Sequence, residues 1–132
     1  MIEVVSIDAR FVDAARRYIG VPWVHQGRSS RGVDCIGLVV LAARDCGLDV
    51  AMEANYGRTQ NYAQMKPLLI RHCVRVGDPG EGVVVLFKNS ALLHLAVMSG
   101  VGTVIHAFGP QRCVIESTIN FEPMQYWRPK WP

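Results

Sequence analysis

Apolar residues recur at helical spacing near the start of the chain, within residues 8–19 (DARFVDAARRYI). Arginines occupy the opposite side, and the sequence Gly-Val-Pro at residues 20–22 interrupts the pattern. Such a stripe is typical of an amphipathic helix that packs one face on a core. We therefore expect a first helix over residues 8–19. Its apolar face would consist of Phe11, Ala14, Ala15, Tyr18 and Ile19.

A second segment, residues 35–46 (CIGLVVLAARDC), is apolar on almost every side. Asp34 precedes it, and an aspartate in this position caps a helix by accepting a hydrogen bond from a first-turn backbone N–H. Gly47 follows it, and glycine is common just past the end of a helix. The pattern predicts a helix from Cys35 to Cys46 that forms the buried centre of the fold.

The connection between these helices, residues 20–33 (GVPWVHQGRSSRGV), contains three glycines, a proline and two serines. This composition favours a long structured loop without regular elements. A third helix is expected over residues 61–69. Pro67 argues against that helix, because proline cannot donate the helical backbone hydrogen bond.

Beyond residues 77–80 (GDPG) the pattern changes to short β-rich runs separated by turn residues. The expected strands are residues 83–87, 94–98, 103–107 and 113–117. The tail, residues 124–131 (MQYWRPKW), is expected to add a last edge strand or an arm, and its aromatic residues would pack on the sheet or serve a partner. Helices followed by an antiparallel meander predict an α+β fold, organised as a single domain over residues 1–132.

Composition narrows the functional classes. The 132 residues carry a net charge of +3, and the basic residues are too scattered for a nucleic-acid-binding surface. No stretch approaches the roughly 20 apolar residues of a membrane span, and the start lacks the features of a signal peptide. We therefore expect synthesis in the cytoplasm and no membrane insertion. The four cysteines form no CxxC pair, so neither disulfides nor a zinc ribbon is indicated.

Cys35 is the candidate nucleophile. In the first turn of its helix it would lie where unpaired backbone N–H groups and the positive end of the helix dipole favour an anion. Such positions lower a thiol pKa from about 8.5 to roughly 3.5–7.5, and the thiolate is the attacking species. Alternatively, Cys35 packs as a small hydrophobe, as Cys46, Cys73 and Cys113 are expected to do. A neighbouring base would decide between these interpretations.

Two of the four histidines lie on consecutive predicted strands. Alternation places His94 on one face with Ala96 and Met98, while His106 shares a face with Val104. The short glycine-rich connection at residues 99–102 predicts a hairpin.

The geometry of that hairpin decides whether the histidines meet. A loop with an odd number of residues centred on Gly100 would place His94 directly opposite His106, with Cβ atoms about 4.5–5.5 Å apart. An even loop would place them on opposite faces. In the first case, one ring takes the thiol proton and the other fixes its tautomer.

Other polar residues are weaker candidates. His25 would line a site or be a solvated loop residue, and Arg28 and Arg31 would hold a substrate carboxylate or be solvated. A metal site formed by Cys35, His94 and His106 lacks ligand-pair spacing, so we expect no metal and no cofactor.

Taken together, these residues resemble the NlpC-type peptidases, papain-like cysteine enzymes that cut the peptide stems of bacterial cell wall. The matching pieces are residues 18–23 (YIGVPW), 27, 32–38 (GVDCIGL), 94–97 (HLAV) and 105–107 (IHA). The resemblance implies a papain-like α+β fold with N-terminal helices packed on a C-terminal antiparallel sheet. It also implies Cys35 as nucleophile, His94 as base and His106 as the polar third member.

Three positions depart from that family's pattern. Ile36 stands where a serine is usual, and Ala96 replaces a glycine beside the base. Trp23 replaces a tyrosine whose hydroxyl resembles an oxyanion-hole donor, so an indole N–H would have to point inward to substitute for it. The expected substrate and oxyanion neighbourhood is Trp23, His25, Arg28, Arg31 and Asp34.

The stretch at residues 34–38 (DCIGL) is similar to versions carried by tailed bacteriophages as tail-tip or tail-assembly peptidases. The resemblance implies a cysteine peptidase that hydrolyses amide bonds in peptidoglycan stem peptides. It further implies delivery by the virion to the periplasmic cell wall, with other phage tail proteins as partners. The alternative, which Trp23 and Ile36 favour, is a catalytically silent structural tail component that retains the fold.

Overall fold

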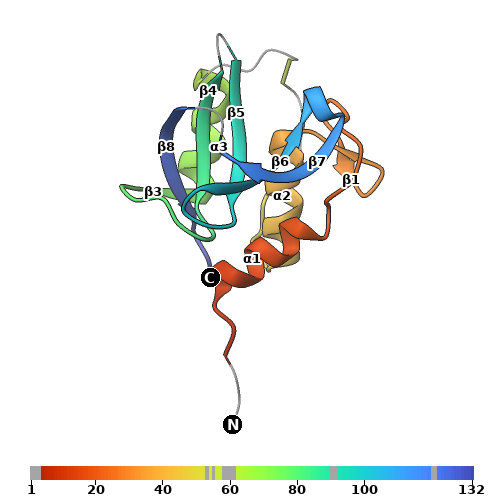
Figure 1. Cartoon of the computed structure of the whole chain (residues 1–132). Helices are drawn as coiled ribbons and strands as arrows, with labels where there is room; N and C mark the ends of the chain where they lie inside the picture. The colour runs from red at the N-terminus through yellow and green to blue at the C-terminus, as the bar shows by residue number, and fades with distance from the viewer. Residues whose placement is uncertain (1–3, 53, 55, 58–61, 90–91, 120–121) are drawn as a thin grey trace.

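The computed structural model describes residues 4–52, 54, 56–57, 62–89, 92–119 and 122–132. Helices α1 (Ile7–Arg16), α2 (Cys35–Asp45) and α3 (Tyr62–His72) pack against a six-stranded antiparallel sheet (Figure 1). Its strands are β3 (Cys73–Val76), β4 (Val84–Asn89), β5 (Leu92–Met98), β6 (Thr103–Phe108), β7 (Cys113–Thr118) and β8 (Glu122–Pro129). Their order is β3-β8-β4-β5-β6-β7. This arrangement confirms the predicted α+β fold, including the β4–β7 meander.

Helix α1 begins as its sequence predicts but ends earlier. The Ser6 side chain caps it by accepting a hydrogen bond from the Ala9 backbone N–H at 3.1 Å. Its apolar face is buried as far as Ala15. The predicted extension to residue 19 is wrong, because the Gly20 N–H donates to the Val114 carbonyl of β7 and the chain turns toward the sheet. Ile19 is consequently 46% exposed.

Helix α2 confirms the prediction of a buried central helix. Asp34 caps it, with its Oδ1 accepting from the Gly37 N–H at 2.8 Å. Its last helical residue is Asp45, and Gly47 takes a φ of +92° just past the end, a conformation that favours glycine. The helix packs against α1 and against strands β5 and β6 of the sheet.

The connection between α1 and α2 is less irregular than its composition suggests. Two short strands, β1 (Arg28–Ser29) and β2 (Gly32–Val33), pair there as a small hairpin. The expectation of a loop without regular elements is therefore wrong. Helix α3 forms with Pro67 inside it, on an exposed side of the helix. It continues to His72, past the predicted end at residue 69, while Asn61 lies outside the described residues.

The C-terminal tail is the largest correction to the predicted fold. Strand β8 lies between β3 and β4, where Trp127 pairs with both Arg75 and Val84, and β3 was not predicted at all. The tail therefore forms an interior strand, not the expected edge strand or arm. Trp127 is buried, and the Trp131 ring meets Phe11 of α1 edge-on at 5.1 Å. The aromatic tail thus packs on its own domain.

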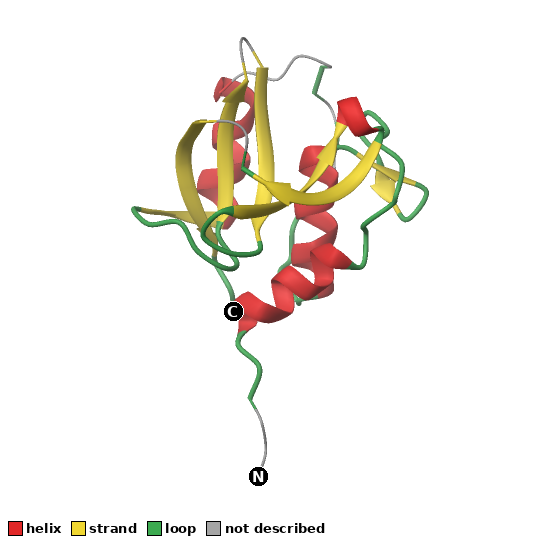
Figure 2. Ribbon diagram, in the orientation of Figure 1, coloured by secondary structure: helices red, strands yellow, loops and turns green. Residues whose placement is uncertain are grey.

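The sheet buries both of its faces around β5. Leu95 and Val97 face the helices, whereas Ala96 and Met98 belong to a second apolar cluster on the opposite face. Figure 2 shows why this second face is covered, since β6 and β7 curl across in front of the upright β4 and β5. The alternation predicted for residues 94–98 is therefore confirmed. The same alternation places His94, at the start of β5, on the face that carries Ala96 and opposite Phe87 of β4.

Candidate active site

Cys35 is the first residue of α2 and is 6% exposed. Its sulfur is hydrogen-bonded by the backbone N–H of Leu95, the residue that follows His94 on β5. The candidate nucleophile therefore lies against the strand that carries the candidate base.

The environment of the Cys35 thiol differs from the sequence-based expectation. Burial raises its pKa to about 12; the Leu95 N–H acts in the opposite direction, and the negative charge of Asp34 raises the pKa further. The expected lowering of this pKa by the helix N-terminus is therefore wrong for the free protein. Desolvation outweighs the backbone donors because the thiolate is shielded from water.

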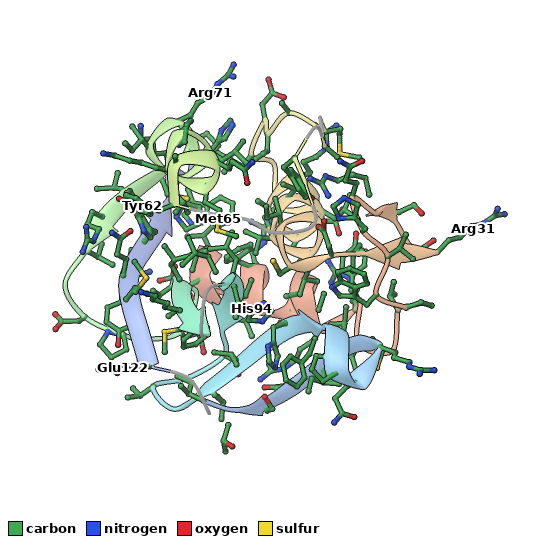
Figure 3. The ribbon with its side chains drawn as sticks, turned by 90° about the horizontal axis from the view of Figure 1, so that it is seen from above. Arg31, Tyr62, Met65, Arg71, His94 and Glu122 are labelled. Atoms are coloured by element: carbon green, nitrogen blue, oxygen red, sulfur yellow. The ribbon has the colours of Figure 1, made fainter. Side chains whose placement is uncertain are left out.

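The histidines meet, but not in the expected register. His94 Nε2 and His106 Nδ1 are 2.7 Å apart. The ladder pairs Val97 with Ile105 and Met98 with Val104, so the hairpin is centred on residue 101, not on Gly100. His94 is therefore a diagonal neighbour of His106 on the same face, a spacing that long side chains can bridge. In Figure 3, His94 lies between α2 and the ribbons of β6 and β7.

Aromatic rings enclose this histidine pair. Phe87, directly opposite His94 on β4, stacks on it with a centroid distance of 6.4 Å, and Phe108 stacks on His106 at 4.9 Å. Burial lowers the pKa of His94 to about 3, and repulsion from a protonated His106 acts in the same direction. Burial also lowers the pKa of His106 to about 4. Both rings are therefore neutral at pH 7, so each carries one N–H and one lone pair.

A hydroxyl extends the pair on the far side. His106 Nε2 lies 3.0 Å from the Ser117 Oγ on β7. Sequence reasoning missed Ser117, although the alternation within its predicted strand and pairing with the histidine strand would have indicated it. His94 on β5, His106 on β6 and Ser117 on β7 thus form a row of hydrogen-bonded side chains, the polar chain.

Beside Cys35, the carboxylate of Asp34 is 1% exposed and saturated with donors. The Gln26 backbone N–H donates to it at 2.8 Å, the Tyr56 hydroxyl at 2.5 Å, and the Arg28 guanidinium at 3.2 Å, in addition to the helix-capping bond from Gly37. Tyr56 was not predicted, because it lies 22 residues from Asp34 and no local pattern links them. This network fixes the residue immediately before the nucleophile.

Gly37 explains how the loop comes so close to α2. A Cβ at this position would lie 2.1 Å from the Gly27 carbonyl oxygen. A glycine one turn into the helix permits a close approach, and the approaching group is the loop itself. Any larger residue at position 37 would displace the loop that supplies Gln26 and Arg28.

The other predicted neighbourhood residues have different surroundings. Arg28 is engaged with Asp34 at 10% side-chain exposure, whereas Arg31 is exposed and extends away from the molecule (Figure 3). The half-buried His25 meets the Tyr56 ring edge-on at 5.9 Å. Trp23 bridges to Val33 and packs against the helix-side core.

Among the described residues, no trio of histidine, cysteine, aspartate or glutamate side chains is arranged to hold a metal ion. Within the same part of the chain, none of the helices is both long enough and apolar enough to cross a membrane.

A central helix that begins with a cysteine, packed on an antiparallel sheet that carries a histidine pair, defines a papain-like α+β domain. The chain belongs to the NlpC/P60 family, whose sequence model matches residues 20–131.

Known proteins agree with this assignment. Two proteins of Corynebacterium glutamicum, both named "Probable endopeptidase", are 30% identical to this chain over 118 residues, which is 89% of this chain and 51% of theirs. The chain therefore spans about half the length of these curated relatives.

Two solved structures share this fold over nearly the whole of this chain and nearly the whole of their own. The NlpC/p60 domain of the peptidoglycan hydrolase SagA has a TM-score of 0.66 at 24% identity, covering 92% of this chain and 97% of that one. RipD of Mycobacterium tuberculosis has a TM-score of 0.63 at 15% identity, covering 95% and 98%. RipD is described as a non-catalytic NlpC/p60 domain protein adapted to peptidoglycan binding. At these identities the likeness concerns the fold alone.

Proposed function

We propose that this chain is a cysteine endopeptidase that hydrolyses amide bonds in peptidoglycan stem peptides. Its family and its similarity to named endopeptidases support the substrate class. The observation that carries the proposal is the 2.7 Å contact between His94 and His106, on the strand whose Leu95 N–H binds the Cys35 sulfur. In this proposal, the nucleophile, the base and the orienting group come from adjacent elements of the fold.

In this mechanism, His94 takes the proton of the neutral Cys35 thiol while the sulfur attacks the scissile carbonyl carbon. Backbone N–H groups in the first turn of α2 stabilise the negative charge that develops on the carbonyl oxygen. The C–N bond then breaks, and His94 returns its proton to the leaving amine. Water attacks the resulting thioester with His94 as base, which releases the acid and restores the thiol. His106 holds the His94 ring throughout.

A second function is favoured by one observation, the burial that raises the pKa of Cys35 to about 12. A thiol that is so rarely ionised suits a domain that binds peptidoglycan without cutting it. The retained fold and a buried cysteine would then serve packing. This second function shares only the loss of catalysis with the silent structural tail component that the sequence also allows.

Digestion of purified peptidoglycan separates the two functions. Soluble fragments would be identified by mass spectrometry after incubation with the wild type, Cys35→Ala or the control Cys46→Ala, which alters the opposite end of α2. We expect the wild type and the control to release stem fragments, and Cys35→Ala to be slower by at least about a thousandfold. Wild-type binding to sedimented wall without any release would favour the second function.

We further propose that the domain is carried by a bacteriophage tail and acts at the periplasmic wall after synthesis in the bacterial cytoplasm. The resemblance of residues 34–38 to phage tail peptidases supports this delivery. Mass spectrometry of purified particles from a host that expresses the protein would test it. Its absence from particles that contain all other tail proteins would contradict it.

A further inference from the structure

Ser117 lies at the end of the polar chain that begins at His94. On the β6–β7 ladder, Val104 pairs with Ser117 and His106 pairs with Ile115. Ser117 is therefore a diagonal neighbour of His106 on the same face, and its Oγ lies 3.0 Å from His106 Nε2. The mechanism above assigns no role to this hydroxyl.

The direction of the hydrogen bonds follows from counting protons. The Ser117 Oγ lies 3.1 Å from the Thr118 carbonyl oxygen, which can only accept a hydrogen bond. Donation of the single hydroxyl proton to that carbonyl leaves the Ser117 oxygen as the acceptor toward His106. His106 must then carry its proton on Nε2 and present a lone pair on Nδ1. Because that lone pair faces His94 Nε2 at 2.7 Å, His94 Nε2 must be the donor.

This direction matters because the contact between the histidines is compatible with two proton arrangements. In the opposite arrangement, His106 donates from Nδ1 and His94 carries its proton on the nitrogen that does not contact His106. A neutral His94 in that form has its lone pair engaged with His106 and cannot accept the thiol proton. Burial keeps both rings neutral at pH 7 by lowering the pKa of His94 to about 3 and that of His106 to about 4.

We propose that Ser117 is a positioning residue that fixes the tautomers of the histidine pair, holding the His106 proton on Nε2 and thereby the basic lone pair of His94 on Nδ1. The tautomer assignment stands on the hydrogen-bond geometry together with the neutrality of both rings at pH 7. Its consequence for catalysis rests on the proposed peptidase function, in which His94 Nδ1 receives the Cys35 proton.

Nitrogen-15 NMR of the full chain tests the assignment directly, because protonated and unprotonated ring nitrogens differ in chemical shift. In the wild type at pH 7 we expect both His94 and His106 to carry their protons on Nε2. Ser117→Ala should mix the two tautomers, and Ser117→Thr, which keeps the hydroxyl, should restore the wild-type spectrum. Ser99→Ala is the control, since Ser99 donates to Thr103 in the β5–β6 hairpin at 2.8 Å and does not touch His106.

Activity supplies the second readout. We expect kcat for stem cleavage to fall about 10-fold to 100-fold in Ser117→Ala, with KM unchanged and with recovery in Ser117→Thr. A wild-type spectrum with the proton on Nδ1 of either ring would overturn the proposal without any variant. Unchanged tautomers in Ser117→Ala would overturn it as well. Failure of the wild type to cleave peptidoglycan would refute only the proposed function, because the tautomers are measured without substrate.

Discussion

The helix side of the site, at the start of α2, is organised around a buried charge, whereas the sheet side, on β5–β7, consists of neutral groups. On the helix side, Asp34 accepts hydrogen bonds from Gly37, Gln26, Tyr56 and Arg28. On the sheet side, two uncharged histidine rings and a serine hydroxyl are joined by hydrogen bonds, and a phenylalanine ring stacks on each histidine. The two sides meet where the Cys35 sulfur contacts the Leu95 N–H.

The contrast between the two sides shows where charge lies in the free protein. Burial acts in opposite directions on the two partners, since it raises the pKa of Cys35 to about 12 and lowers that of His94 to about 3. Both shifts disfavour a thiolate–imidazolium pair. The Asp34 carboxylate is instead paired with Arg28 and accepts from the Gln26 backbone N–H, which holds the loop on α2. In the proposed mechanism, charge separation between Cys35 and His94 is therefore confined to the attack on substrate.

The largest expected effect concerns the reactivity of Cys35 toward iodoacetamide. A raised pKa means a smaller thiolate fraction at any given pH below it, so alkylation should be slow at pH 7. It should accelerate about tenfold per pH unit as the pH rises toward about 12. At pH 7 a thiol of pKa about 12 has roughly a thousandfold less thiolate than one of ordinary pKa.

Site-resolved mass spectrometry would follow Cys35, with the half-buried Cys46 on the same chain as the internal reference. Rapid labelling of Cys35 that is independent of pH through the neutral range would reveal a preformed ion pair. That result would remove the contrast between a neutral Cys35–His94 pair on one side and the charged Asp34–Arg28 pair on the other.

The second effect concerns the charge on the helix side. Asp34→Ala leaves the Arg28 guanidinium, 10% exposed, without its carboxylate, and loss of one partner from a buried pair costs about 3–5 kcal/mol. Urea denaturation would measure this loss in the free energy of unfolding. The double variant Asp34→Ala/Arg28→Met should recover part of it, because no unpaired charge remains.

Asp8→Ala is the matched control for this prediction. Asp8 pairs with Arg128 at 2.6 Å, but the two side chains are 31% and 41% exposed, so a loss below about 1 kcal/mol is expected. Equal losses of unfolding free energy in Asp8→Ala and Asp34→Ala would show that burial does not make the Asp34 ion pair more important for stability than an exposed one.

The sequence predicts local features of both sides and misses the contacts between distant segments. Helix α2 is predictable because its cap Asp34 and its terminating Gly47 are adjacent to it in sequence. The shared face of His94 and His106 is predictable because strand side chains alternate with a period of two. Their diagonal offset is not, since it depends on which residue forms the apex of the hairpin.

Non-local pairing accounts for the remaining errors. Strand β8 enters the sheet between β3 and β4, and nothing within its own eight residues indicates those neighbours. Burial of Cys35 depends in turn on β5, about sixty positions further along the chain, so a helix-terminus argument alone gave the wrong direction for its pKa. Tyr56 was missed for the same reason. Its hydroxyl matters only because folding brings it to Asp34.

The smallest expected effect isolates that hydroxyl. Tyr56→Phe removes a 2.5 Å hydrogen bond to a carboxylate that is 1% exposed, and bonds to charged groups contribute about 1.5–3 kcal/mol to the free energy of unfolding. Tyr18→Phe removes the same kind of bond, 2.7 Å to the exposed Asp45. There water replaces the lost donor, and a change within about 0.5 kcal/mol is expected. If both variants lose the same free energy of unfolding in urea denaturation, burial does not strengthen the hydrogen bonds to Asp34. If only Tyr56→Phe is destabilised, the buried hydrogen bonds to Asp34 contribute to the stability of the helix side.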